Sequence, residues 1–163
     1  MKKILKKIFI GLLIIFVVIQ FFRPGKNRSD GISAHDISTK YPVPDSVQAI
    51  LKIACNDCHS NNTRYPWYAE IQPVAWWLNN HIKDGKIALN FSYFTSYRIK
   101  KQLHRLDDIN EQVKKNEMPL SPYTLIHTDA NLTAQQKLTL ANWTESLRDS
   151  IKAHYPADSL FGK

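Results

Sequence analysis

The chain has 163 residues, of which 22 are basic and 14 are acidic, and only two are cysteine. Two cysteines exclude a fold held together by a disulfide framework. Most of the net charge of +8 comes from the start of the chain, because from Lys40 onward 15 basic and 12 acidic residues leave only +3. This weak excess predicts no nucleic-acid partner.

The amino-terminal region is predicted to be a signal anchor over residues 1–23. Four lysines precede residues 8–22, which are apolar except for Gly11 and Gln20. A basic segment followed by an apolar one is typical of an export signal, and no convincing cleavage site follows. We therefore expect an uncleaved transmembrane helix rather than a cleaved peptide. It would place a single-pass protein in the inner membrane, with its folded domain in the periplasm.

The rest of the chain divides into three predicted parts. Residues 24–44 contain glycine, proline and small polar residues without helical or strand periodicity, which indicates a flexible tether. Residues 45–155 are predicted to form one all-α domain, because apolar residues recur at helical spacing and no run alternates as a strand would. The last residues, 156–163, are expected to be a tail.

Four helices are predicted within the domain: residues 45–54, residues 70–83, residues 96–115 and a fourth from Thr133. Gly85 is expected to end the second helix. The third has a clear amphipathic stripe, made by Ile99, Leu103, Leu106, Ile109 and Val113. Thr133 and Gln136 have the spacing of a capping box, which marks the start of the fourth.

The first helix leads into the motif Cys55-Asn56-Asp57-Cys58-His59, a C-x-x-C-H sequence. This motif is the attachment signature of c-type haem. The thiols of Cys55 and Cys58 would form thioethers with the two vinyl groups, and the adjacent His59 would be the proximal ligand of the iron. We therefore expect one covalently bound haem c per chain.

Three other interpretations of the two cysteines are weaker. A thioredoxin-like redox pair belongs in a βαβ context, which the predicted helices do not provide. A zinc site would need a second pair of ligands at similar spacing, whereas the other histidines occur singly. A structural disulfide that closes so short a loop would add little stability.

The distal ligand of the iron is predicted to be Met118. It is the one methionine besides the initiator, and it follows the third helix in a loop with Pro119 and Pro122. Proline restricts the backbone and would hold such a ligand in place, although a lone methionine can also fill a core. His81 and His127 are the alternative ligands.

Several segments together resemble the bacterial haem-binding domain family of small, exported, c-type cytochrome-like proteins. They are the C-N-D-C-H-S-N run from Cys55, R-Y-P-W-Y from Arg64, L-N-F-S from Leu89, and E-M-P-L with P-Y from Glu117. The resemblance covers roughly residues 50–147. It implies a cytochrome c-like helical domain around one haem, in which the first and last helices pack together.

Electron transfer at the periplasmic face of the membrane is the expected function, with no catalytic residue, because no nucleophile or acid–base group clusters with the motif. The redox partners cannot be named from the sequence. One alternative is a haem enzyme or a gas or redox sensor with an open iron site, such as a small peroxidase, in which His81 or His127 would act as acid or base. Another is a non-catalytic module of a membrane complex.

Overall fold

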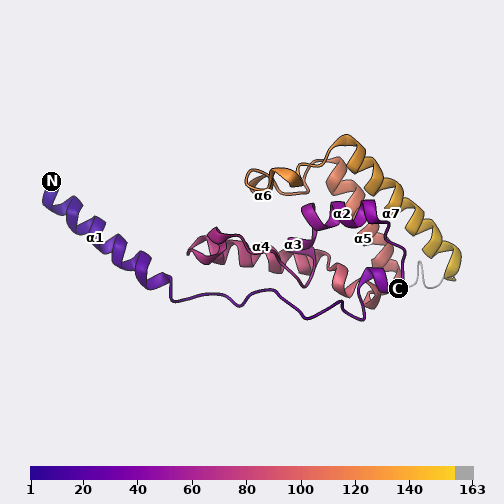
Figure 1. Ribbon diagram of the computed structural model, residues 1–163, viewed down its shortest axis with the longest axis horizontal. Coiled ribbons are helices and arrows are strands. Elements are labelled where there is room, and N and C mark those ends of the chain that lie inside the picture. Colours follow the sequence, from indigo (N-terminus) through magenta and orange to yellow (C-terminus); the bar gives the residue numbers. More distant parts are fainter. Residues whose placement is uncertain (157–163) are drawn as a thin grey trace.

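The computed structural model describes residues 1–156, and every regular element within them is a helix (Figure 1). The α-helices are α1 Lys2–Ile19, α2 Asp45–Ala54, α3 Asn56–His59, α4 Val74–Ala88, α5 Ile99–Lys114, α6 Ser121–Thr124 and α7 Ala134–His154. Four short 3-10 helices connect them: η1 Ile37–Thr39, η2 Trp67–Glu70, η3 Phe91–Ser96 and η4 Thr128–Ala130. The described part is therefore all-helical, as predicted. The expected tail, residues 156–163, lies outside it apart from residue 156.

The predicted transmembrane helix over residues 1–23 is wrong. Among residues 1–156, no helix has both the length and the apolar character that crossing a membrane requires. Helix α1 ends at Ile19 and includes the four lysines, so its longest uncharged run is residues 8–19. At about 1.5 Å per residue they span about 18 Å, against about 30 Å of hydrocarbon. The predicted single-pass inner-membrane localisation, which rested on this helix, is contradicted by the same finding.

Helix α1 buries none of its own side chains and projects from the other helices (Figure 1). The chain that follows it is bonded to the domain through Gln72, which is fully buried. The Gln72 backbone N–H donates to the Gln20 side chain at 2.9 Å, and its carboxamide donates to the Phe22 carbonyl at 2.9 Å. The Trp76 indole N–H donates to that same carbonyl at 2.7 Å. These bonds join positions about fifty residues apart.

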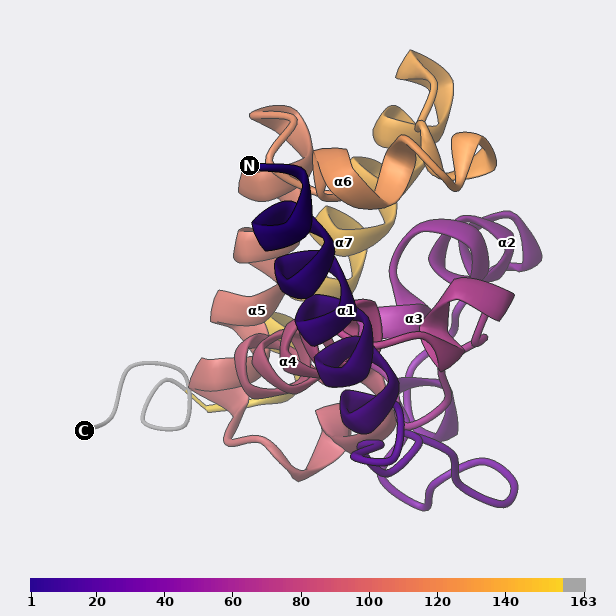
Figure 2. The ribbon, with the colours of Figure 1, turned by 90° about the vertical axis from the view of Figure 1, so that its left-hand side faces the viewer.

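The core lies between α2, α5 and α7. Helices α5 and α7 lie side by side, α2 packs against α7, and α3 packs against α2 and α4 (Figures 1 and 2). The predicted stripe of α5 is buried from Leu103 onward. It belongs to one hydrophobic cluster with the buried apolar residues of α7, which are Leu140, Trp143, Leu147 and Ile151. Each fully buried side chain of this kind contributes about 1.5–3 kcal/mol.

Two helix boundaries follow directly from the predicted signals. Helix α2 covers the predicted residues, and α7 begins at the predicted capping box. There the Gln136 N–H donates to the Thr133 hydroxyl at 3.2 Å, and the Thr133 N–H donates to the Gln136 side chain at 2.8 Å. Helix α4 differs, because it starts later than predicted and continues through Gly85 to Ala88. The prediction that Gly85 ends this helix is wrong, because this glycine makes a close contact with a neighbouring helix, described below.

Candidate functional site

The C-x-x-C-H motif lies where α2 ends and α3 begins. Cys55 is the residue between the two helices, and its carbonyl accepts hydrogen bonds from the N–H groups of Cys58, at 3.2 Å, and of His59, at 2.9 Å. This tight turn brings both thiols and the imidazole to the same side of the domain. The two cysteines are free thiols.

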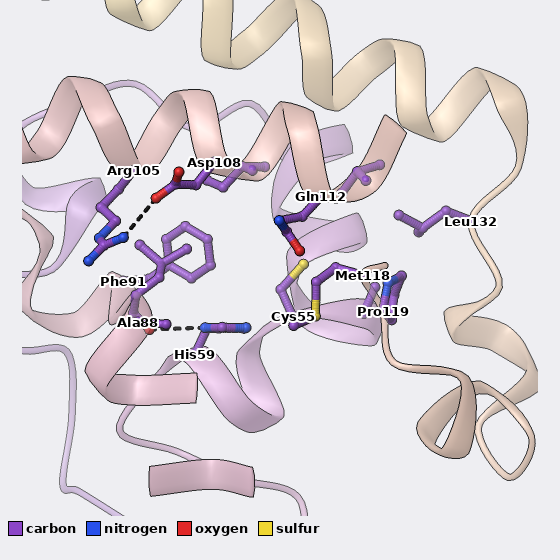
Figure 3. Close-up of a pocket in the computed structure, with 14 residues that line it drawn as sticks. Cys55, His59, Ala88, Phe91, Arg105, Asp108, Gln112, Met118, Pro119 and Leu132 are labelled. Atoms are coloured by element: carbon purple, nitrogen blue, oxygen red, sulfur yellow. Dashed lines mark hydrogen bonds and ion pairs between the residues drawn. The ribbon is translucent and has the colours of Figure 1, made fainter. Parts of the chain in front are cut away.

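The imidazole of His59 is fixed by two backbone carbonyls, one within α4 and one in the residue that follows it. Its Nδ1 lies 2.9 Å from the Gly85 oxygen and 3.0 Å from the Leu89 oxygen. Because carbonyls only accept hydrogen bonds, Nδ1 carries the proton, and Nε2 keeps a lone pair. Burial lowers the pKa of His59, although the two carbonyl bonds act in the opposite direction. The ring is therefore a neutral, oriented donor, and it points into the cavity (Figure 3).

Gly85 lies where α4 packs tightly against Cys58 of α3. A Cβ atom at this position would lie 2.7 Å from the Cys58 carbonyl oxygen, which is closer than any side chain can fit. The glycine is therefore required for the contact between two helices, and the helix continues through it. The same contact brings the Gly85 carbonyl within reach of His59.

Two adjoining cavities border the motif, with volumes of about 320 and 230 Å³. Together they fall in the range of roughly 300–1,000 Å³ that is usual for ligand sites. Both are lined by Ala54, Cys55, His59, Ala88, Met118 and Pro119. Cys58 and His81 line only the smaller cavity, and His127 lines neither. The two cavities thus bring together five of the site residues that the sequence analysis named, the candidate ligand His81 among them, and leave the candidate ligand His127 outside.

The two thiols differ from those of reactive cysteines. Burial, together with the charge of Cys58, raises the pKa of Cys55 to about 12, and burial with the charge of Asp57 raises the pKa of Cys58 to about 11. Both are therefore protonated at neutral pH, whereas redox-active thiols have lowered pKa values. Within residues 1–156, no group of three or more His, Cys, Asp or Glu side chains is placed to hold a metal ion.

The backbone of Met118 is attached to the end of α5. The Gln112 carbonyl accepts hydrogen bonds from the N–H groups of Glu117, at 2.9 Å, and Met118, at 3.2 Å. Between them, Asn116 has a φ of 59°, in the left-handed region that asparagine tolerates at helix ends. This compact reversal turns the chain back over the cavity and holds Met118 in its wall.

A second attachment connects the Met118 loop to the motif itself. The Tyr123 hydroxyl donates to the buried Asp57 carboxylate at 2.7 Å, and Arg64 binds the same carboxylate oxygen at 3.1 Å. Burial and the bond to Asp57 raise the pKa of Tyr123 well above its usual value. Its ring stacks on His127 at a centroid distance of 4.3 Å, and the His127 Nε2 lies 2.6 Å from the Tyr68 hydroxyl. His127 therefore supports the loop rather than facing the cavity.

A family model described as the haem-binding domain matches residues 14–146 of the chain. The chain belongs to the haem-binding domain family. The resemblance inferred from the motifs is thereby confirmed, and haem binding with it. Neither a curated protein nor a solved structure matches this haem-binding domain.

The cavity fits a haem. Its lining is mainly apolar, as a porphyrin requires. The neutral imidazole of His59 offers Nε2 to a metal, and its Nδ1–H is bonded to carbonyls, which is the usual arrangement of a metal-binding histidine. Cys55 and Cys58 both border the same space. Cys55, Cys58 and His59, the residues that would hold the group, thus line one cavity.

Two charged residues of the larger cavity were not foreseen from the sequence. Arg105 and Asp108 project from α5 into its wall (Figure 3), and the Arg105 Nη1 lies 2.7 Å from the Asp108 carboxylate. In the sequence they belong to the charged positions of an amphipathic helix, which usually face solvent. Here this part of α5 lines a cavity, together with Leu89 and Phe91.

Proposed function

We propose that this haem-binding domain is a c-type electron carrier with one haem per chain. In this proposal Cys55 and Cys58 hold the group through thioethers, and His59 binds the iron. Each thiol adds across a vinyl double bond, so that sulfur bonds to one carbon and hydrogen to the other, with no net oxidation. Bound haem would supply an iron that cycles between the ferrous and ferric states. The carrier would exchange electrons with other redox proteins.

One observation carries this proposal: the imidazole of His59 has its Nδ1–H bound by two carbonyls and shares a cavity with both thiols. An imidazole held in this way presents Nε2 to the iron without rotating. The raised pKa values of the thiols support addition as S–H groups rather than thiolate redox chemistry.

Met118 is the proposed distal ligand. It lines both cavities, and its loop is fixed at one end by Gln112 and at the other by the bond between Tyr123 and Asp57. A ligand loop with two attachments keeps the thioether at the iron and excludes small molecules. Thioether ligation also raises the reduction potential, which suits a carrier.

A second candidate function is a haem enzyme or sensor with an open coordination site. It is favoured by His81, which lines the smaller cavity together with Asp84. The Nδ1 of His81 lies 2.9 Å from the Trp77 carbonyl, so its Nε2 is available as a distal acid or base. In this case Met118 would be a wall residue, and the iron would bind external ligands freely.

Two measurements on the holoprotein test the proposal. Covalent attachment predicts that the haem stays with the protein in acid–acetone, and extraction of the haem into the solvent would contradict it. Met118 ligation predicts a sulfur-to-iron band in the near-infrared spectrum of the ferric protein. A high-spin ferric spectrum without this band would instead support the open site.

A further inference from the structure

The larger cavity has a cationic end, formed by Arg105 of α5. Arg105 lies across the cavity from Cys55 (Figure 3). In the part of the chain that the structure describes, it is the one lysine or arginine that lines either cavity. Its side chain is only 24% exposed. A cation in a mainly apolar wall is costly unless an anion is bound beside it.

The guanidinium of Arg105 is only partly satisfied. Its Nη1 binds Asp108 at 2.7 Å, but its Nε is buried and has no hydrogen-bond partner among residues 1–156. Buried donors in proteins are nearly always bonded. Arg148 has the same unpaired Nε but lines neither cavity, so the position of Arg105 in the cavity wall is what points to a ligand. Asp108 occupies only Nη1 of its guanidinium, and a planar guanidinium is best matched by a carboxylate.

The chemistry of haem provides such a carboxylate. The vinyl groups lie along one edge of the porphyrin, and the two propionates leave the opposite edge. If Cys55 and Cys58 hold the vinyl edge, the propionates extend toward the far end of the cavity, where Arg105 lies. Asp108 would then keep the guanidinium oriented through Nη1 and leave the other terminal nitrogen, Nη2, for the ligand.

We propose that Arg105, positioned by Asp108, binds a haem propionate. The proposal rests on the proposed haem orientation and deepens it by assigning the carboxylate end of the site. Arg64 is the other arginine near the motif, but its guanidinium already binds both carboxylate oxygens of Asp57, at 3.3 and 3.1 Å. It also lines neither cavity.

The test compares two porphyrins on the full chain. Ferric haem and its dimethyl ester, in which both propionates are uncharged, are titrated into chains that carry Cys55→Ala and Cys58→Ala, so that binding is reversible. Adding Arg105→Gln should weaken binding of ferric haem by about 10- to 100-fold, the effect of losing a charge-assisted hydrogen bond. Binding of the dimethyl ester should change little. Arg105→Lys keeps the positive charge but lacks the planar guanidinium, so it should give an intermediate loss of affinity for ferric haem.

Arg148→Gln is a matched control. Arg148 also pairs with an aspartate, Asp107, at 2.9 Å, has a side chain that is 24% exposed, and has a buried Nε without a partner among residues 1–156. It lines neither cavity. Its substitution should cost similar stability without changing the affinity for either porphyrin.

Two outcomes would overturn the proposal. If Arg105→Gln leaves the affinity for ferric haem unchanged, or weakens both porphyrins equally, Arg105 does not bind a propionate. If the chain with Cys55→Ala and Cys58→Ala but unchanged Arg105 binds neither porphyrin, the haem site as a whole is contradicted. The extraction test of covalent attachment uses the unsubstituted chain and is independent of these results, so the two proposals can fail separately.

Discussion

The bond between Tyr123 and Asp57 should control how long Met118 stays at the iron. Tyr123→Phe removes a hydroxyl that donates to a buried carboxylate at 2.7 Å and leaves the aromatic ring in place. The Asp57 side chain is only 8% exposed, so water cannot easily replace the lost donor. A hydrogen bond to a charged group contributes about 1.5–3 kcal/mol, and we expect the free energy of unfolding to fall by about that amount.

Loss of this hydrogen bond should also make the Met118 loop open more often. If the bond is broken whenever the loop opens, the open population rises by about 10- to 100-fold. If Met118 is the distal ligand, carbon monoxide can bind ferrous iron only after Met118 has left, so its binding rate should rise by a similar factor. Rapid mixing of the reduced protein with carbon monoxide measures this rate, and denaturant unfolding measures the stability.

Tyr65→Phe provides the matched control. Its hydroxyl accepts a hydrogen bond from the Asn27 backbone at 2.6 Å, outside the Met118 loop. This variant should lose stability without faster binding of carbon monoxide. If Tyr123→Phe loses stability but keeps the original rate, the bond does not hold the loop closed. Immediate binding of carbon monoxide by the unsubstituted protein would refute ligation by Met118 itself.

Three further predictions concern single positions. Met118→Ala should shift the ferric haem toward high spin and remove the sulfur band; an unchanged spectrum with a stability loss of about 2–5 kcal/mol would make Met118 a core residue. Gly85→Ala should destabilise the protein by about 1–3 kcal/mol and lower the ratio of haem to protein absorbance, whereas Gly11→Ala, with nothing within 4 Å, should not. Thr133→Ala should lower the free energy of unfolding by about 0.5–2 kcal/mol without altering the haem spectrum, and Thr133→Ser should retain most of the stability.

Helices whose signals lie within a few consecutive residues were predicted correctly from the sequence. The apolar stripe of α5 and the capping box of α7 each depend on residues a few positions apart, and both are present in the structure. Gly85 was misinterpreted because the usual meaning of a glycine near the end of a helix is a stop. Here the residue admits the Cys58 carbonyl from a different helix, and no pattern within α4 contains that information.

The candidate site divides in the same way. The motif from Cys55 to His59 is contiguous, so its chemistry is readable from the sequence, and the scarcity of methionine drew attention to Met118. The partners of these residues are distant in the chain: Leu89 for His59, and Tyr123 for Asp57. Such pairings depend on how the helices pack. Arg105 was missed because a charged residue on an amphipathic helix normally faces water.

The buried position of Gln72 has a practical consequence for shortening the chain. A version that begins after Phe22 would leave the backbone N–H and carboxamide of Gln72 and the Trp76 indole without the acceptors they now have. Trp76 is partly exposed, but Gln72 is fully buried. Each buried donor without a partner costs about 1–3 kcal/mol, and a domain of this size is stable by only about 5–15 kcal/mol. Residues 2–19, by contrast, include no buried side chain. The boundary between dispensable and required sequence therefore falls at Gln20, at the end of the first helix rather than at the start of the second.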